Sequence, residues 1–307
     1  MSSKKITFEN SRGEKLSAKI ELPIDQKPHN FAIFAHCFTC NKNFKSVRHI
    51  TRALTAKGFG VLSFDFTGLG ESEGAFEDTT FSSTVDDLLC AAGYLKENHQ
   101  PASLIVGHSL GGAAVLLAAS QLSEIKAVVT IGAPSAPQHV KHLLQNGIAD
   151  IKEKGIAEIN IGGRPFNIRR EFIDDLDNQN LLGIVKNLRK SFLFMHSPQD
   201  TIVGVENASE LYQAATHPKS FVSLDGADHL LSKEEDACYA GDVIANWAKR
   251  YVELPETKEL STKSHIVAYL DTSEKFTTQI KADQHQFVAD EPKSFGGNDF
   301  GPSPYQL

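Results

Sequence analysis

The stretch VGHSLGGAAV at residues 106–115 holds one serine between two glycines at the end of an apolar run. Gly107 and Gly111 lie two residues before and two residues after Ser109. This G-x-S-x-G spacing is typical of a sharp strand-to-helix turn that exposes the serine hydroxyl. Bulkier residues at the glycine positions would collide across the turn. The apolar SLIV before it and AAVLLAAS after it predict the strand and the helix that the motif requires.

Short apolar runs recur along the chain, and helical patterns separate them. Such runs are typical of strands buried on both faces of a parallel sheet, and their alternation with helices predicts right-handed β-α-β units. Polar–apolar alternation on both sides of SRG predicts an antiparallel hairpin near the N-terminus. The predicted strands are 5–10, 15–22, 30–36, 59–65, 103–108, 126–132, 191–196 and 219–224, and the predicted helices are 45–57, 81–98, 110–122 and 233–251.

An insertion of short helical pieces at residues 133–190 interrupts this rhythm, with a hairpin expected to turn at Gly162 and Gly163. We expect it to form a cap, because loops at that sheet edge carry binding, and a surface excursion is the alternative. The fold class is therefore α/β, a mostly parallel central sheet with helices on both faces, an N-terminal antiparallel hairpin and a small helical and hairpin cap. The expected organisation is one domain over 1–254, a polar linker over 255–264 and a strand-like segment over 265–307 that is too short for its own core.

Composition and charge exclude several classes of function. The chain has 307 residues with 41% hydrophobic and 22% charged residues, as in ordinary globular proteins. Its formal net charge of -7 argues against a nucleic-acid or anionic-membrane partner. The first residues contain no apolar core of signal-peptide length, and no stretch approaches the roughly 18 apolar residues of a membrane span. We therefore expect a cytoplasmic protein.

Four cysteines are present, at positions 37, 40, 90 and 238. Cys37 and Cys40 form a C-x-x-C, which is typical of a redox pair or of half a zinc site. No second C-x-x-C and no H-x-x-x-H accompanies it, so a closed four-ligand zinc site is not expected. We expect two reduced cytosolic thiols in a loop, and a redox pair is the alternative.

A serine hydroxyl becomes a useful nucleophile only beside a base that a carboxylate orients. In the chain order typical of this turn, the acid comes next and the histidine last. Asp200 follows the predicted strand SFLFMH, and His229 follows the predicted strand KSFVSL. Both residues therefore sit at carboxyl ends of strands, the same sheet edge as Ser109. We predict that Ser109, His229 and Asp200 are the catalytic residues.

Other residues compete for these roles. Asp225 and Asp228 lie near the predicted histidine in sequence, but the side chain of an adjacent residue usually diverges from its neighbour. His108 is expected to pack or to form a hydrogen bond, and His36 to hold the shape of its loop.

Acyl transfer also needs donors for the oxyanion. The backbone amide of Leu110 is one predicted donor, and the amide of Phe38 in HCFTC is the other. Gly68 and Gly70 in DFTGLGESEG are expected to allow close packing beneath the site.

Taken together, the motifs HCFTC-NKNF, DFTGLGES, GHSLGG, HSPQD and GADH resemble the α/β-hydrolase superfamily in order and spacing, over about residues 5–252. The resemblance implies the hydrolase fold and a serine triad of Ser109, Asp200 and His229. One departure is Cys37, because the family often has glycine after the histidine. A side chain at this position narrows the oxyanion loop and so affects how the amide of Phe38, the second predicted donor, is placed.

The C-terminal segment resembles the opening of an OsmC-type domain, a family of thiol-dependent hydroperoxide reductases, through ADEP, GG-x-D and GPSPY. The reactive cysteines of that family lie further along than Leu307. The resemblance therefore implies a hydrolase–OsmC fusion cut inside its second domain, without peroxide reduction by this chain. We expect the segment to be disordered or to borrow a strand edge from the hydrolase or from a second copy, which would make a homodimer.

The leading hypothesis is a carboxylesterase that acts on small to medium acyl esters through an acyl-serine, with no cofactor and no metal. The small size is inferred because the cap has no long run of large apolar residues. The alternatives are a peptidase or amidase, a thioesterase, and a non-catalytic module that partners a peroxide-reducing domain. The expected partner is a small-molecule ester, without nucleic acid or membrane.

Overall fold

The computed structural model describes residues 2–23, 30–37, 40–138, 145–161, 164–252, 260–261, 263–270, 276–297, 301–303 and 305–306. Its strands are β1 (Ser2–Glu9), β2 (Lys15–Leu22), β3 (Asn30–Ala35), β4 (Phe59–Phe64), β5 (Ala102–His108), β6 (Ala127–Ile131), β7 (Ile156–Ile161), β8 (Arg164–Arg169), β9 (Ser191–His196), β10 (Lys219–Ser223), β11 (Ile266–Leu270), β12 (Thr278–Ala282) and β13 (His285–Ala289). Its helices are α1 (Lys45–Ala56), α2 (Phe81–Asn98), α3 (Leu110–Gln121), α4 (Gln145–Lys154), α5 (Arg170–Asp177), α6 (Leu181–Asn187), α7 (Glu206–Ala214) and α8 (Glu234–Ala248), with short 3-10 turns η1 (Phe76–Asp78) and η4 (Lys293–Phe295).

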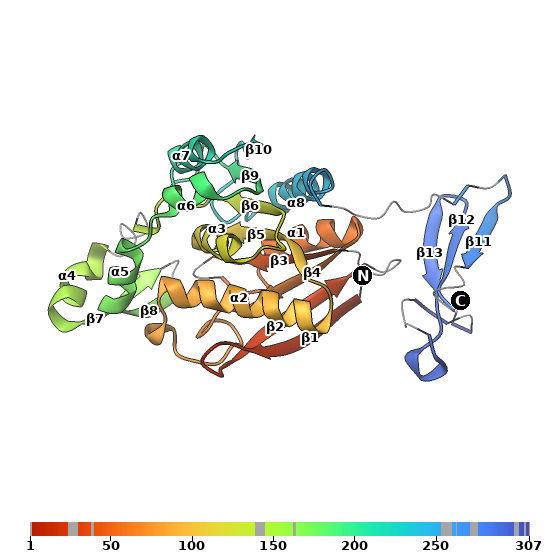
Figure 1. The fold of residues 1–307 in the computed structure, drawn as a ribbon, viewed down its shortest axis with the longest axis horizontal. Helices are drawn as coiled ribbons and strands as arrows, with labels where there is room; N and C mark the ends of the chain where they lie inside the picture. The colour runs from red at the N-terminus through yellow and green to blue at the C-terminus, as the bar shows by residue number, and fades with distance from the viewer. Residues whose placement is uncertain are drawn as a thin grey trace.

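An eight-stranded sheet in the order β1-β2-β4-β3-β5-β6-β9-β10 forms the centre of the larger unit (Figure 1). The strands from β4 to β10 in this order pair in parallel, whereas β2 pairs antiparallel with both β1 and β4. This is the mostly parallel α/β sheet that the apolar runs predict, with the N-terminal antiparallel hairpin, and it is the α/β-hydrolase fold that the resemblance implies. Because the strands are parallel, the loops after β3, β5, β9 and β10 all leave from one edge of the sheet.

Helices cover both faces of this sheet, and each face has its own core. Ile33 and Ile105 point into the core under α2, α3, α6 and α7, and their neighbours Phe34 and Val106 point into the core under α1 and α8. This alternation follows from the two-residue period of a strand. All four side chains are fully buried, so the continuous apolar runs reflect burial on both faces.

The insertion between β6 and β9 contains α4, α5, α6 and the two-stranded sheet β7–β8. The hairpin strands end at Ile161 and restart at Arg164, so its predicted turn at 162–163 lies outside the described residues, as does the stretch 139–144. The insertion packs on the rest of the unit through aromatic rings: Phe76 lies 5.0 Å from Phe166 between ring centroids, with the two rings edge to face.

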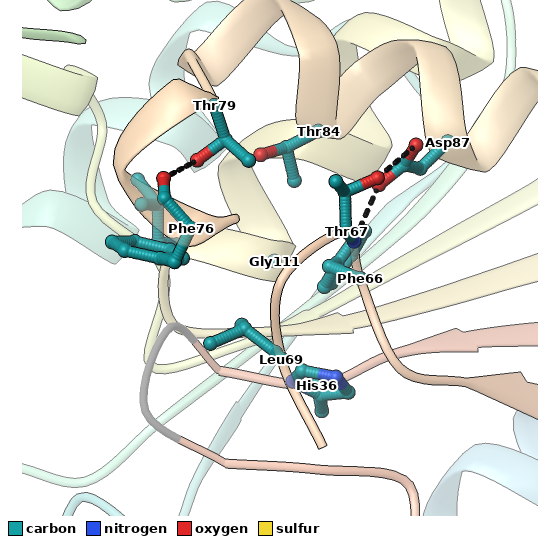
Figure 2. Close-up of a pocket in the computed structure, with 10 residues that line it drawn as sticks. His36, Phe66, Thr67, Leu69, Phe76, Thr79, Thr84, Asp87 and Gly111 are labelled. Atoms are coloured by element: carbon teal, nitrogen blue, oxygen red, sulfur yellow. Dashed lines mark hydrogen bonds between the residues drawn. The ribbon is translucent and has the colours of Figure 1, made fainter. Parts of the chain in front are cut away.

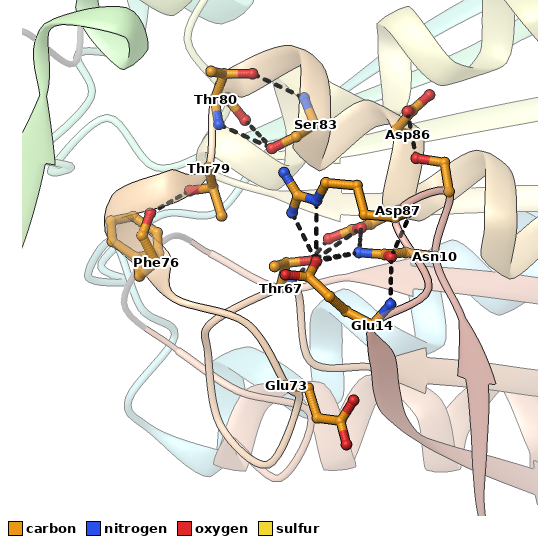
Figure 3. A network of polar contacts seen from close by, with 12 residues as sticks. Asn10, Glu14, Thr67, Glu73, Phe76, Thr79, Thr80, Ser83, Asp86 and Asp87 are labelled. Carbon is orange, nitrogen blue, oxygen red and sulfur yellow. Dashed lines mark hydrogen bonds and ion pairs between the residues drawn. The ribbon is translucent and has the colours of Figure 1, made fainter.

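A network of buried polar groups ties the N-terminal hairpin to the loop after β4 and to α2 (Figure 3). The amide of Thr67 donates to Oδ2 of Asp87 at 2.9 Å, and its hydroxyl donates to Oδ1 at 3.0 Å. Asn10 donates from Nδ2 to the same threonine hydroxyl at 3.0 Å. Burial raises the pKa of Asp87, although the bonds from Thr67 act against this. The network fixes the start of the loop that lies beneath the candidate site.

The C-terminal segment forms its own antiparallel sheet in the order β11-β12-β13, which Figure 1 shows to one side of the larger unit. The expectation of disorder or of a borrowed hydrolase edge is therefore wrong for these described residues, because successive strands pair with each other. Pairing with a second copy stays a prediction. Residues 253–259 and 262, most of the expected linker, lie outside the described part of the chain.

The predicted strands and helices of the main sheet match the structure to within a few residues at their ends. Helix α7 was not predicted, because ENASELYQA follows a loop without a strong apolar period. Among the described residues, none of the helices is both long enough and apolar enough to cross a membrane.

Candidate active site

Ser109 lies at the turn between β5 and α3 with φ 56° and ψ −125°. A positive φ is strained for a residue with a side chain, and such strain persists only where the surroundings hold it. A Cβ atom on Gly107 would lie 2.4 Å from the carbonyl oxygen of Gly111, and one on Gly111 would lie 2.4 Å from the carbonyl oxygen of His36. The glycine spacing is therefore a steric requirement of this turn.

Three loops bring Ser109, His229 and Asp200 into one hydrogen-bonded chain. Oγ of Ser109 lies 2.8 Å from Nε2 of His229, and Nδ1 of His229 lies 2.7 Å from Oδ2 of Asp200. A carboxylate only accepts, so Nδ1 donates to it, and Nε2 is left to accept from the serine hydroxyl. The arrangement is able to remove a proton from the serine oxygen and hold the resulting imidazolium beside a carboxylate.

The surroundings of Asp200 keep it ionised. Its Oδ1 accepts the backbone amides of Ile202 and Val203, both at 2.9 Å. Burial alone would raise the pKa of Asp200, but the hydrogen bond and charge of His229, together with these two amides, lower it below the ordinary value. The carboxylate is therefore a permanent partner for the imidazole at neutral pH.

The two other carboxylates considered as partners of His229, those of Asp225 and Asp228, form hydrogen bonds elsewhere. Oδ1 of Asp225 accepts the hydroxyl of Ser223 at 2.8 Å, and Oδ1 of Asp228 accepts the amide of Ser232 at 2.8 Å. The structure brings only Asp200, of these three, to the ring of His229.

Two further histidines support the site through hydrogen bonds. Nε2 of His108 lies 2.7 Å from the carbonyl oxygen of His229, and burial, with the nearby charge of His229, lowers the pKa of His108 to about 3. His196 approaches the carbonyl oxygen of Val203 at 2.7 Å, and burial lowers its pKa also. Both rings are neutral at pH 7 and donate from Nε2. They hold the backbone that presents His229 and Asp200.

Leu110 is the first residue of α3, and its amide is one of the N–H groups that have no acceptor within a helix. This position next to Ser109 suits the predicted oxyanion donor. Phe38, the other predicted donor, lies outside the described residues. The loop around it begins at His36, whose carbonyl meets the turn at Gly111, and whose Nδ1 lies 2.7 Å from the carbonyl oxygen of Cys37.

A disulfide joins Cys37 and Cys40, so the expectation of two reduced thiols is wrong in this structure. The C-x-x-C spacing brings the two Cα atoms to 5.3 Å, which is within the range that a disulfide requires. The amide of Cys40 also donates to the carbonyl of Cys37 at 3.1 Å. Both residues are buried at the base of the predicted oxyanion loop.

A buried ion network that sequence reasoning missed supports the same loop. Nζ of Lys42 lies 2.5 Å from Oδ2 of Asp65 and 2.7 Å from Oε2 of Glu71, and the amide of Lys42 donates to Oδ1 of Asp65 at 2.6 Å. Hydrogen bonds from Lys42 and Lys5 hold the pKa of Glu71 at about 2. The network joins the loop after β3 to the loop after β4. The only sequence signal is Asp65 at a strand end.

A small cavity of about 20 Å³ lies beside the turn, in contact with Leu110 and Gly111 (Figure 2). Leu69, Phe76 and His36 are among its other lining residues. In the loop after β4, which carries Leu69, Gly68 and Gly70 both have positive φ. A Cβ on either glycine would overlap neighbouring atoms, as expected for close packing beneath the site. The volume is that of roughly one water molecule or methyl group.

Residues 27–181, about half of the chain, match the family described as Hydrolase_4, serine aminopeptidase, S33. The chain belongs to this family. It is therefore a serine hydrolase with the α/β-hydrolase fold.

Individual relatives agree with this membership. The crystal structure of the esterase domain from a Rhodothermus marinus protein is 50% identical, with a TM-score of 0.69, and the match covers 82% of this chain and 99% of that one. Est1E from Butyrivibrio proteoclasticus, in a structure with ferulic acid bound, is 21% identical with a TM-score of 0.71 over 80% of this chain and 98% of its own, and shows the fold alone.

A curated relative, putative esterase/lipase 2 of Mycoplasma pneumoniae, is 30% identical over 107 residues. These residues are 34% of this chain and 38% of the relative, so the match spans well under half of that protein.

Proposed function

We propose that this serine hydrolase is a carboxylesterase that cleaves esters of small carboxylic acids, with Ser109, His229 and Asp200 as its catalytic residues. The observation that carries the proposal is the continuous chain of hydrogen bonds, 2.8 Å from Ser109 to His229 and 2.7 Å from His229 to Asp200. The half-identical esterase domain from Rhodothermus marinus supports ester cleavage in particular.

The proposed reaction has two halves. Nε2 of His229 takes the proton of Ser109 as Oγ attacks the ester carbonyl, and the protonated imidazole then gives this proton to the leaving alcohol. His229 takes a proton from water as the water oxygen attacks the acyl-serine, and it then returns this proton to Oγ of Ser109 as the C–O bond breaks, which releases the acid and the free serine. The amide of Leu110 stabilises the negative oxygen in both tetrahedral intermediates, and the amide of Phe38 is the proposed second donor.

The cavity beside Leu110 supports a small acyl group in this proposal. Its volume of about 20 Å³ accommodates the methyl group of an acetyl ester, and Leu69 and Phe76 are among the residues that line it. This favours acetyl and similarly short acyl groups within the small to medium range.

Peptide or amide cleavage is the second candidate, because the family description names an aminopeptidase. Ester, amide and thioester cleavage share the same tetrahedral intermediate, so the hydrogen-bond geometry favours none of them over the others. Aminoacyl p-nitroanilides and acyl thioesters measured beside p-nitrophenyl esters separate the three.

For the C-terminal segment, we retain the proposal of an OsmC-like region fused to the hydrolase. It is supported by the sequence likeness and by the separate sheet of β11, β12 and β13. We also retain a small-molecule ester as partner, a second copy of the chain as a further partner through this segment, and a cytoplasmic location. Sedimentation of the whole chain beside a variant lacking residues 265–307 tests the second copy.

The decisive experiment is labelling with a fluorophosphonate probe and turnover of p-nitrophenyl acetate. Ser109→Ala is expected to lose both labelling and turnover while its unfolding transition is unchanged. Ser63→Ala is the matched control, because Ser63 is buried in β4 and its hydroxyl has no hydrogen-bond partner among the described residues. A wild-type chain that neither labels nor turns over esters, amides or thioesters would instead indicate a non-catalytic module.

A further inference from the structure

A second cluster of chemically reactive side chains lies between α1 and α8, outside the candidate active site. His49 comes from α1, and Glu234 and Cys238 come from α8. One donor atom of each lies within 4.8 Å of the donor atoms of the other two. Among the described residues this is the one group of at least three such side chains close enough to share an ion. The proposed hydrolase mechanism uses none of them.

The two helices hold this cluster in place. Glu234 and Cys238 are four residues apart, so they lie on one face of α8, one turn from each other. A Cβ atom on Gly241, on the next turn of α8, would lie 2.8 Å from the Cβ of Ala53 and 3.0 Å from the Cα of Ile50. Glycine therefore lets α8 approach α1 closely just beyond the cluster. This close contact fixes the separation between His49 and the donors on α8.

His49 has no hydrogen-bond role elsewhere in the described structure. Its side chain is only 10% exposed, and its Nδ1 lies 3.5 Å from Sγ of Cys238. Its Nε2 is buried without a hydrogen-bond partner among the described residues, and the nearest carboxylate oxygen, Oε2 of Glu234, is 3.9 Å away. The Nδ1 edge of the ring therefore faces the thiol of Cys238, and the Nε2 edge faces the carboxylate of Glu234.

The kinds of donor in the cluster select the kind of ion. One thiolate sulfur, one imidazole nitrogen and one carboxylate oxygen suit Zn²⁺, whereas Mg²⁺ and Ca²⁺ prefer oxygen alone. With Zn–S near 2.3 Å and Zn–N near 2.0–2.1 Å, tetrahedral ligands S and N lie about 3.6 Å apart. The observed 3.5 Å between Sγ of Cys238 and Nδ1 of His49 agrees with this separation.

We propose that Cys238, His49 and Glu234 bind one Zn²⁺ ion, with water at the remaining position. The thiol of Cys238 releases its proton to solvent when the sulfur–zinc bond forms. Glu234 is the donor that moves, because its side chain is 61% exposed and free to rotate inward. It leaves Lys45, whose Nζ lies 3.9 Å from the same carboxylate. The ion would join the N-terminal halves of α1 and α8, which follow the loops carrying Cys37 and His229.

The test uses the whole chain, purified without thiol reductants or chelators so that the disulfide stays closed. Cobalt(II) replaces zinc and gives a thiolate-to-metal charge-transfer band only when a sulfur binds it. We expect this band to saturate at one Co²⁺ per chain and to disappear when Zn²⁺ displaces the cobalt. Mg²⁺ is expected to displace no cobalt.

Three variants locate the ion. Cys238→Ser is expected to lose the band, and His49→Gln to weaken Co²⁺ binding at least about tenfold, since even indirect partners of a ligand have effects of this size. Cys90→Ser is the matched control and is expected to keep the wild-type band, because Cys90 is the other half-buried free thiol. No band in the wild type, or a band that persists in Cys238→Ser, would overturn the proposal.

A second measurement uses only the wild-type chain, so it tests the site even if a variant fails to fold. In the wild-type chain, saturating Zn²⁺ is expected to protect Cys238 from iodoacetamide while Cys90 alkylates at an unchanged rate, as measured by peptide mass spectrometry. Equal alkylation of Cys238 with and without Zn²⁺ would also overturn the site. Ester turnover is measured alongside, and it reports on the proposed function independently of zinc.

Discussion

Nε2 of His108 donates to the carbonyl oxygen of His229 across 2.7 Å, so the residue before the serine holds the backbone of the histidine that faces it. The two rings also pack with their centroids 5.1 Å apart. His108 therefore links the turn after β5 to the loop after β10. The ring makes this link in its neutral form at pH 7, because burial, with the charge of His229 nearby, lowers the pKa of His108 to about 3.

His108 is expected to make the protein less stable in acid. The unfolded chain binds a proton at this residue below about pH 6.5, whereas the folded chain does so only near pH 3. Stability is therefore fully present above pH 6.5 and falls by about 1.4 kcal/mol per pH unit between these values. His108→Gln should reduce the loss between pH 7.5 and pH 5 by about 2 kcal/mol.

Urea unfolding of both proteins at the two pH values measures this difference. His285→Gln, at an exposed histidine of β13, is the control, and it should lose as much unfolding free energy between the two pH values as the wild type does. An equal loss in wild type and His108→Gln would mean that His108 is already protonated in the folded chain at pH 5.

Asp200→Asn is expected to lower kcat about 10³- to 10⁴-fold with little change in KM, because an amide at this position favours the wrong tautomer of His229. The steady-state kinetics of p-nitrophenyl acetate give both constants. Asp228→Asn is the matched control, because its carboxylate accepts only the Ser232 amide on the same loop. If the two variants lost activity equally, Asp200 would not be the orienting acid.

The parts of the fold and site that the sequence predicts are those that depend on local chemistry. The apolar runs indicate the strands because burial on both faces excludes polar residues, and the glycines at 107 and 111 indicate the turn because a Cβ would collide there. The chain order then selects Asp200 and His229. The hydrogen bonds at 2.7 and 2.8 Å agree with that selection in geometry, and the roles of the residues await the variants above.

The parts that sequence does not predict depend on contacts between distant segments. Lys42 lies in a polar stretch that is typical of an exposed loop, yet its side chain is only 2% exposed because it meets Asp65 from the loop after β4. The Cys37–Cys40 disulfide depends on the path of the backbone around it, which residue type alone does not specify. The same holds for His49 and Cys238, which are 189 positions apart in the chain.

Lys42→Met is expected to lower the free energy of unfolding by about 3–5 kcal/mol, because it leaves the carboxylate of Asp65 buried without its cation. The double variant Lys42→Met with Asp65→Asn should be more stable than the single one, since it removes the unpaired charge as well. Urea unfolding of the wild type, Lys42→Met, Asp65→Asn and the double variant gives the coupling energy. If the losses in unfolding free energy of the two single variants were additive in the double variant, Lys42 and Asp65 would not be coupled energetically.

Leu69→Ala is expected to shift acyl preference toward longer chains, because Leu69 forms a wall of the 20 Å³ cavity beside Leu110. A methylene in an apolar pocket changes the specificity by roughly 10-fold or more, so the ratio of kcat/KM for p-nitrophenyl butyrate over acetate should rise about tenfold. Leu122→Ala, the same truncation at the far end of α3, should leave this ratio unchanged. A wild-type enzyme that cleaved octanoate as fast as acetate would show that the acyl group binds elsewhere, and the ratio in Leu69→Ala would then not move.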